Sequence, residues 1–293
     1  MKQVVLGSLN VSETAFGCMS LSPDNAEAST LLQSAIDQGI TLFDTADLYD
    51  QGRNEELVGR SLTHRRQEIV LATKVGNQWR ADGSGWDWNP RKDYILQAVE
   101  GSLRRLRTDY IDLYQLHGGT LEDSLDETID AFETLKKSGK VREYGISSIR
   151  PNVIREWTSR SSMVSVMMQY GLLDRRPEEA AMPLLAENGI AVLARGSLAK
   201  GLLAGKPAAP FLGYPAAAVA RATEAVAFLA DSHRTPGAIA IRYALQRASV
   251  AVVGIRTELQ LTDAVRASEI LLSPEEIDIL SRVLTPETYR DHR

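Results

Sequence analysis

Short apolar segments alternate with amphipathic stretches along nearly the whole chain. The apolar segments are mostly continuous rather than alternating with polar residues, which is typical of strands that are buried on both faces of a parallel sheet. Strands are predicted at residues 14–18, 40–44, 68–74, 111–117, 140–147, 163–169, 190–194 and 249–254. A short hairpin formed by residues 3–6 and 10–11 precedes the first of them.

The intervening stretches carry apolar residues at helical spacing. Ile95, Val99, Leu103 and Leu106, for example, fall on one stripe of a helix. Helices are predicted at residues 26–38, 53–62, 90–106, 124–137, 152–159, 178–188, 216–232, 237–246 and 258–267. Glycine follows several of them, as at Gly39, where a residue with positive φ can end a helix.

About eight strand–helix units in succession predict a (β/α)₈ TIM barrel with a short N-terminal β-hairpin. The chain of 293 residues is long enough for this fold, which needs about 250. No linker or change of composition divides it, so residues 1–293 are expected to form a single domain. The alternative is a doubly wound open sheet. A dinucleotide-binding sheet of that kind would carry G-x-G-x-x-G after an early strand, and the motif does not occur there.

Composition excludes several classes of protein. The formal net charge of −5 argues against a nucleic-acid-binding surface, which would be basic. Cys18 is the only cysteine, so an internal disulfide and a cysteine-based zinc site are ruled out, and a reducing cytoplasmic compartment is the simplest interpretation. No apolar run approaches the ~18 residues of a membrane span, the N-terminal apolar run is too short for a signal peptide, and no ligand cluster suggests a metal.

Polar residues stand at the ends of several predicted strands. Asp44, Lys74, His117, Gln169 and Arg195 each end or directly follow an apolar segment. Tyr49 lies in the loop five residues beyond Asp44. The carboxyl ends of barrel strands form the rim on which active sites are built, and a structural core does not require this pattern. The sequence therefore predicts an active site at this rim.

Three motifs carry a resemblance to a known family. Phe-Asp-Thr-Ala-Asp-Leu-Tyr at 43–49, Ala-Thr-Lys at 72–74 and Leu-Tyr-Gln-Leu-His at 113–117 resemble the aldo-keto reductase superfamily. The similarity extends from the N-terminal hairpin to about residue 270 and points to a bacterial member of the branch that includes general-stress proteins and potassium-channel β subunits. It implies a barrel that binds NADPH without a Rossmann fold.

The resemblance implies a catalytic set of Asp44, Tyr49, Lys74 and His117. Reduction of a carbonyl needs a proton on oxygen, and Tyr49 is the expected donor. Lys74 is expected to lower the pKa of Tyr49, with Asp44 holding Lys74 charged, while His117 orients the carbonyl. Alone, each residue has a plainer interpretation: a turn residue, a packing aromatic, a solvated charge or a structural histidine. The combination indicates catalysis.

Cofactor contacts are also carried over from the resemblance. Gly17, Cys18 and Met19 are expected near the nicotinamide or the substrate, and Ser147, Ser148 and Gln169 at the nicotinamide carboxamide. The backbone N–H groups of Gly196, Ser197, Leu198 and Gly201 are expected to bind the pyrophosphate, with Lys200 or Lys206 as a cation. Gly254, Arg256, Gln260 and Asp263 match the segment that holds the adenosine 2′-phosphate, adenine and ribose; Arg256 favours NADPH over NADH.

Three positions depart from the family pattern. Arg195 stands where most relatives have an aromatic residue that stacks on the nicotinamide, so it is expected to stack, to contact the cofactor or to recognise an anionic substrate. Ser148 and Ala264 stand where many relatives have asparagine.

The loop 76–90 contains three tryptophans, Trp79, Trp86 and Trp88, and is expected to cap the substrate pocket. The leading hypothesis is an NADPH-dependent oxidoreductase that reduces small aldehydes or ketones to alcohols, active as a monomer or weak homo-oligomer. Two alternatives stay open. One is a catalytically weak, NADPH-binding regulatory subunit. The other is a Schiff-base aldolase that uses Lys74.

Overall fold

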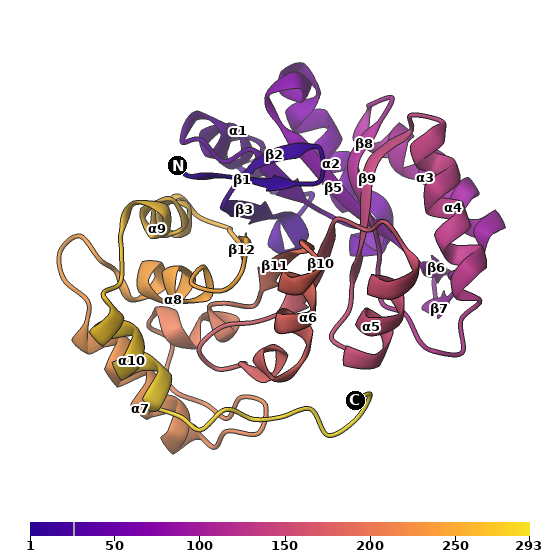
Figure 1. The fold of residues 1–293 in the computed structure, drawn as a ribbon. Coiled ribbons are helices and arrows are strands. Elements are labelled where there is room, and N and C mark those ends of the chain that lie inside the picture. The colour runs from indigo at the N-terminus through magenta and orange to yellow at the C-terminus, as the bar shows by residue number, and fades with distance from the viewer. Residues whose placement is uncertain (26) are drawn as a thin grey trace.

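Parallel strands close into a barrel at the centre of the protein (Figure 1). The computed structural model describes residues 1–25 and 27–293. The barrel order is β10-β11-β12-β3-β4-β5-β8-β9, all eight strands being parallel to their neighbours. The strands are β3 (Thr14–Gly17), β4 (Leu42–Asp44), β5 (Val70–Val75), β8 (Ile111–Leu116), β9 (Val141–Ser147), β10 (Ser165–Gln169), β11 (Ala191–Arg195) and β12 (Val250–Gly254). The predicted (β/α)₈ fold is confirmed, and the open sheet is wrong.

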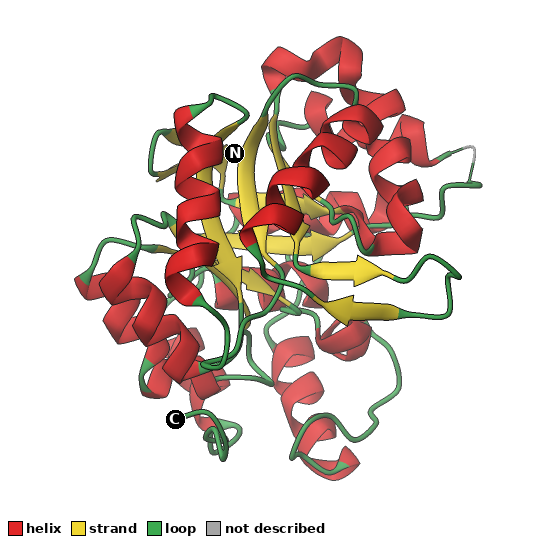
Figure 2. Ribbon diagram, turned by 90° about the vertical axis from the view of Figure 1, so that its right-hand side faces the viewer, coloured by secondary structure: helices red, strands yellow, loops and turns green. Residues whose placement is uncertain are grey.

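Helices surround the strands on the outside (Figure 2). They are α1 (Ala28–Asp37), α2 (Arg53–Leu62), α3 (Lys92–Leu106), α4 (Leu125–Lys137), α5 (Pro151–Arg160), α6 (Ala181–Glu187), α7 (Ala216–Phe228), α8 (Pro236–Ala244), α9 (Glu258–Glu269) and α10 (Pro274–Arg282). The predicted stripe on α3 is buried, with Ile95 and Val99 fully covered. The predicted first residue of the first helix, Ala26, lies outside the described residues.

The N-terminal hairpin closes one end of the barrel. Strands β1 (Gln3–Leu6) and β2 (Leu9–Ser12) pair antiparallel, as predicted. Leu6 and Val11 are buried and belong to one apolar cluster with the barrel-lining residues Leu42, Leu113 and Leu193. Fully burying one such side chain is worth about 1.5–3 kcal/mol relative to exposure. The hairpin therefore seals the N-terminal end, and the site must form at the other end.

Three segments differ from the prediction. The loop 76–90 contains a second hairpin, β6 (Asn77–Trp79) and β7 (Trp86–Trp88). The helix predicted at 178–188 is divided into a 3-10 turn, η4 (Arg176–Glu179), and α6. Proline can occupy only the first turn of a helix, and Pro183 in the first turn of α6 explains why the helix cannot begin earlier. The helix α10 was not predicted.

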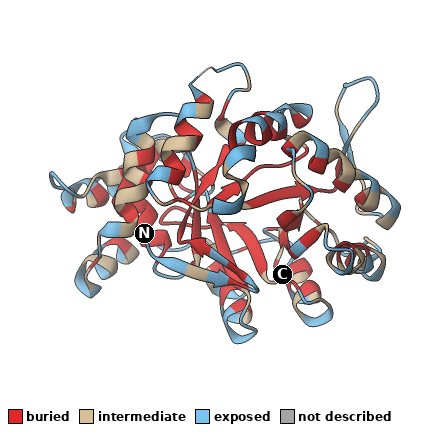
Figure 3. Cartoon of the chain, turned by 90° about the horizontal axis from the view of Figure 1, so that it is seen from above, coloured by how far each residue is buried: buried red, intermediate tan, exposed pale blue. Residues whose placement is uncertain are grey.

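Burial follows the layers of the fold. In Figure 3 the barrel strands are coloured as buried, whereas the outward faces of the helices are exposed. Strands covered on both faces explain the continuous apolar segments in the sequence. Within residues 1–25 and 27–293, no helix is both long and apolar enough to cross a membrane.

Candidate active site

Lys74 and Asp44 form a buried ion pair between neighbouring strands. The Lys74 Nζ lies 2.8 Å from Asp44 Oδ1 and 2.7 Å from Oδ2, and it donates a further hydrogen bond of 2.7 Å to the carbonyl oxygen of Thr45. The pairing of β4 with β5 produces this arrangement, because Asp44 lies opposite Ala72. The side chains are only 1% and 6% exposed, so the ammonium group is fixed by its partners rather than by water.

Tyr49 and His117 complete a cluster at the same end of the barrel. The Tyr49 hydroxyl lies 3.4 Å from Lys74 Nζ. The Tyr49 and His117 rings meet edge to face, with centroids 5.8 Å apart and planes at 84°. The chain beyond Tyr49 makes an unusual turn, because Asp50, Gln51 and Gly52 all have positive φ. The four residues that the motifs singled out thus lie together.

Burial and charge set the protonation of this cluster. Burial lowers the pKa of Lys74, but Asp44 and Tyr49 outweigh it and the pKa is raised. Burial raises the pKa of Tyr49, and Lys74 lowers it, as expected, by a smaller amount, so the pKa of the phenol is raised overall in the protein alone. Burial, with the charges of Lys74 and Arg195, lowers the pKa of His117 to about 3. At neutral pH the cluster contains an ammonium, a neutral phenol and a neutral imidazole.

Polar residues outside the predicted set contact Asp44 and its neighbour Thr45. Gln115 Nε2 donates to Asp44 Oδ1 over 3.4 Å. The Thr45 hydroxyl donates to Asn54 Oδ1 over 2.7 Å, and Asn54 Nδ2 donates to the Cys18 carbonyl oxygen over 2.9 Å. One signal was present in the sequence. Gln115 precedes His117 by two residues, which places both on the same face of a strand.

Arg195 is exposed at the end of β11, beside Gln169 at the end of β10. Its Nη1 donates to Gln169 Oε1 over 3.3 Å. The guanidinium charge lowers the pKa values of Tyr49 and His117, although burial dominates both shifts. The positive charge of Arg195 therefore acts on Tyr49 and His117. Gln169 has a second partner that the sequence reasoning also missed, Asp174.

The predicted nicotinamide contacts next to β3 and β9 differ in how far they are exposed to solvent. Ser147 is partly exposed, whereas Ser148 is buried and its Oγ accepts from the Arg150 N–H over 3.3 Å. Cys18 is fully buried, and burial raises the pKa of its thiol, so it behaves as a small packing residue. Met19 is 66% exposed. Gly17 packs against Val253: a Cβ added to Gly17 would lie 3.2 Å from the carbonyl oxygen of Val253.

One amide of the loop after β11 already has a partner within the protein. The N–H of Gly201 donates to the Leu198 carbonyl oxygen over 2.8 Å, so this amide is used inside the turn in the protein alone. Gly196 is exposed with φ of 76°, Ser197 is buried and Leu198 is partly buried. The Lys206 ammonium donates to the Lys200 carbonyl oxygen over 2.9 Å. Both lysines are exposed beside the loop.

The segment after β12 presents one exposed cation. Gly254 and Arg256 are exposed just before α9. The Arg256 backbone N–H donates to Gln260 Oε1 over 2.8 Å. Asp263 Oδ1 accepts from the Thr235 hydroxyl over 2.8 Å, which ties α9 to the start of α8. Gln260 and Asp263 thus already have partners within the protein, whereas the Arg256 side chain reaches solvent.

The tryptophans of loop 76–90 are only partly brought to the site. Trp79 Nε1 donates to the Leu48 carbonyl oxygen over 3.2 Å, next to Tyr49. Trp88 Nε1 donates to Asp123 Oδ1 over 2.9 Å. Its ring packs over Gly118, where an added Cβ would lie 3.2 Å away. Trp86 is 47% exposed, so two of the three tryptophans are anchored beside the strand ends.

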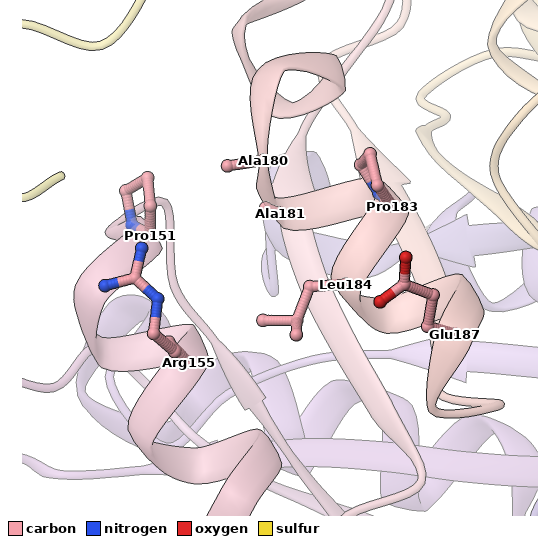
Figure 4. A pocket seen from close by; sticks show the side chains of 7 residues that line it. All are labelled: Pro151, Arg155, Ala180, Ala181, Pro183, Leu184 and Glu187. Atoms are coloured by element: carbon pink, nitrogen blue, oxygen red, sulfur yellow. The ribbon is translucent and has the colours of Figure 1, made fainter.

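A groove of about 290 Å³ lies away from this cluster, on the outside of the barrel between α5 and α6 (Figure 4). Pro151, Ala180, Ala181, Pro183 and Leu184 give it an apolar lining, with Arg155 and Glu187 on opposite helices. It includes no residue of the cluster and is not the candidate active site.

Comparison with known proteins identifies the family. The family model of the aldo/keto reductase family matches residues 5–285. The chain belongs to the aldo-keto reductase family. It is 47% identical to YqkF of Bacillus subtilis strain 168, described as an uncharacterized oxidoreductase, over 100% of both chains. Aldo-keto reductases are oxidoreductases, and the Schiff-base aldolase is therefore set aside.

Solved structures of aldo-keto reductases share the fold. The holo form of aldo-keto reductase AKR11C1 from Bacillus halodurans has a TM-score of 0.94 and 46% identity, covering 100% of this chain and 99% of that one. The glycerol dehydrogenase AKR11B4 from Gluconobacter oxydans has a TM-score of 0.88 and 25% identity, covering 99% of this chain and 98% of that one. Both of these solved structures are of bacterial proteins. Family membership implies a nicotinamide cofactor and a small carbonyl substrate.

Proposed function

We propose that this aldo-keto reductase reduces aldehydes or ketones to alcohols with NADPH, using Tyr49 as the proton donor. The observation that supports it most is the buried contact chain from Asp44 through Lys74 to the Tyr49 hydroxyl, with His117 edge-on to the tyrosine ring. Asp44 and the Thr45 carbonyl hold the ammonium group, so Lys74 faces Tyr49 as a fixed positive charge.

The rim residues fit an extended dinucleotide. Strands β9, β10, β11 and β12 are consecutive neighbours in the barrel. Polar groups follow the same order: Ser147 and Gln169 at β9 and β10, the loop from Gly196 after β11, and Arg256 after β12. This order matches carboxamide, pyrophosphate and adenosine 2′-phosphate. An arginine guanidinium suits the 2′-phosphate because it can form two charge-assisted hydrogen bonds.

Each residue of the cluster has a defined task. A bound reduced nicotinamide would supply a hydride to the carbonyl carbon. Tyr49, protonated at neutral pH, gives its proton to the oxygen, which becomes far more basic than a phenolate as charge develops. Lys74 stabilises the resulting phenolate. His117 is neutral, so an imidazole N–H can donate to the carbonyl oxygen without adding a charge.

The protein is mixed with NADPH and a panel of aliphatic and aromatic aldehydes and ketones. We expect rapid consumption of NADPH and formation of the corresponding alcohol. Binding of NADPH is measured in parallel by quenching of tryptophan fluorescence. Tight binding without turnover of any carbonyl would favour the regulatory alternative. We further propose that residues 1–293 act as one catalytic unit, as a monomer or weak homo-oligomer, which gel filtration with light scattering would check.

Lys74 also bears on the aldolase alternative. A Schiff base requires a free amine, yet Lys74 is fully buried, has a raised pKa and donates to Asp44 and Thr45. Failure of borohydride to trap a carbonyl compound on Lys74 is the expected outcome.

A further inference from the structure

The side-chain amide of Gln169 has a fixed direction. Its Nε2 donates to Asp174 Oδ2 over 2.9 Å, and its Oε1 accepts from Arg195 Nη1 over 3.3 Å. An ionised carboxylate can only accept hydrogen bonds and a guanidinium can only donate them. The NH₂ end of Gln169 must therefore face Asp174, and the carbonyl end must face the side of Arg195.

Asp174 is itself held rigidly. It is 4% exposed, and Arg176 binds both of its oxygens, with Nε 2.8 Å from Oδ1 and Nη2 2.7 Å from Oδ2. Its backbone pairs with Gly171 through two hydrogen bonds of 3.0 and 3.1 Å, which close a tight loop directly after β10. Leu172 and Leu173 inside that loop are buried in an apolar cluster. Asp174 cannot turn away without disrupting this loop.

The C-terminal segment contacts Arg176, the partner of Asp174 in this ion pair. The Arg176 guanidinium lies 4.9 Å from the centre of the Tyr289 ring, and Tyr289 is 8% exposed. The segment continues past η4 to α5, where the Asn152 N–H donates to the His292 carbonyl oxygen over 2.9 Å. In Figure 1 it runs from α10 toward the end labelled C, beside α5. The end of the chain therefore packs against the Asp174–Arg176 ion pair, which holds Gln169.

Gln169 also packs against the neighbouring loop. An added Cβ at Gly196 would lie 3.2 Å from Gln169 Cγ, and one at Gly171 would lie 3.1 Å from Ser197 Cα. The two rim loops thus hold the side chain of Gln169 in place up to Cγ, and the direction of the terminal amide is set by its hydrogen-bond partners. The group that Gln169 presents to a ligand is its carbonyl oxygen, Oε1. Because this oxygen accepts hydrogen bonds, it favours a ligand group that donates one.

We propose that Asp174 is a positioning residue: it holds the NH₂ end of Gln169 so that the carbonyl oxygen receives the N–H of the nicotinamide carboxamide. This inference rests on the proposed function. Without Asp174, either end of the glutamine amide could face the cofactor, and the preference for a donating ligand group would be lost. Arg176 and Tyr289 stabilise Asp174 from behind.

The test compares two cofactors that differ only in whether the group on the nicotinamide ring has an N–H donor. In the 3-acetylpyridine analogue of NADP⁺ a methyl group replaces the carboxamide NH₂. Dissociation constants for both are measured by tryptophan fluorescence quenching. The native protein should bind the analogue more weakly by on the order of tenfold, the value of one hydrogen bond. In Asp174→Asn the ratio of the two constants should fall toward one.

Asp112→Asn is the matched control. Asp112 is also buried and paired with an arginine, Arg66 Nη2 at 2.6 Å, but it lies on β8 away from Gln169. This variant should keep the native ratio. If Asp174→Asn does not fold, Gln169→Ala provides the same test, because removal of the acceptor should also bring the ratio toward one.

The outcomes separate the two proposals. If the native protein binds neither cofactor, the proposed function fails. If it binds both and the ratio in Asp174→Asn or Gln169→Ala stays at the native value, the role of Asp174 is refuted while the proposed function stands.

Discussion

Lys74 Nζ lies 2.7 Å from Asp44 Oδ2 and 3.4 Å from the Tyr49 hydroxyl, so one buried cation joins a carboxylate to a phenol. Asp44→Asn removes the charge that balances this ammonium group. Breaking a buried pair in this way costs about 3–5 kcal/mol, and a drop of this order in the free energy of unfolding is expected from urea denaturation. Carbonyl reduction should fall as well.

The control for that variant is Asp87→Asn, which breaks an exposed pair with Arg80. Exposed pairs contribute at most about 1 kcal/mol. Equal destabilisation by the two variants would contradict the importance assigned to the buried pair.

His117 should make stability depend on pH. Its pKa is about 3 in the folded protein, against about 6.5 in the unfolded chain. Between these values the unfolded chain binds a proton that the folded protein does not, so stability falls as the pH falls from 6.5 toward 3. At about 1.36 kcal/mol per unit of pKa, the loss between pH 6.5 and 4 is about 3 kcal/mol.

Carboxylates also titrate in this range, so the measurement compares urea denaturation of the native protein and His117→Asn at several pH values. The variant should lose less stability on acidification. His64→Asn, at an exposed position, serves as control and should behave as the native protein. Parallel curves for the native protein and His117→Asn would show that the low pKa of His117 does not cause the loss of stability.

Arg195 should influence the pH dependence of the reaction. Its charge lowers the pKa of Tyr49, though less than burial raises it, so Arg195→Gln should raise that pKa further. Alcohol oxidation requires the ionised tyrosine, and its rise with pH should shift to higher pH in the variant. Arg80→Gln, in the β6–β7 hairpin, should leave the profile unchanged. A shift to lower pH in Arg195→Gln would contradict the arrangement.

Arg256→Ala should change the choice of cofactor. Loss of a charge-assisted hydrogen bond costs about 1.5–3 kcal/mol, so the dissociation constant for NADPH should rise by roughly tenfold or more. The constant for NADH, which lacks the 2′-phosphate, should stay nearly the same. Arg266→Ala, near the other end of α9, is the control. Equal weakening of both cofactors by Arg256→Ala would count against the 2′-phosphate assignment.

Much of the fold could be predicted because buried parallel strands have a strong pattern. Continuous apolar segments located the barrel strands, and strand ends located Asp44, Lys74 and His117. The hairpin β6–β7 was missed because each strand has only three residues and pairs only with the other. Helix α10 was missed because few of its residues are buried, Leu280 being the one fully covered. Its start signal was present, since Ser273 and Glu276 form a capping box.

The parts of the site that escaped prediction depend on burial and on loop conformation. The sequence suggested that Lys74 lowers the pKa of Tyr49, but only the structure shows that burial outweighs it. Asp174 looks like an ordinary loop residue until the turn at Gly171 directs it back to Gln169. The Gly201 amide was expected to be available, and the turn that uses it could not be read from the glycine alone.

Tyr49→Phe tests most directly whether Tyr49 donates the proton. It is compared with Tyr110→Phe, whose ring packs against Arg66 and Arg142 outside the cluster. NADPH-dependent carbonyl reduction and NADPH binding are measured on each. We expect Tyr49→Phe to keep its affinity for NADPH and to lose about 10²–10⁴-fold in turnover, the usual contribution of a general acid, while Tyr110→Phe keeps both. Turnover that survives Tyr49→Phe would contradict the role of Tyr49 as proton donor.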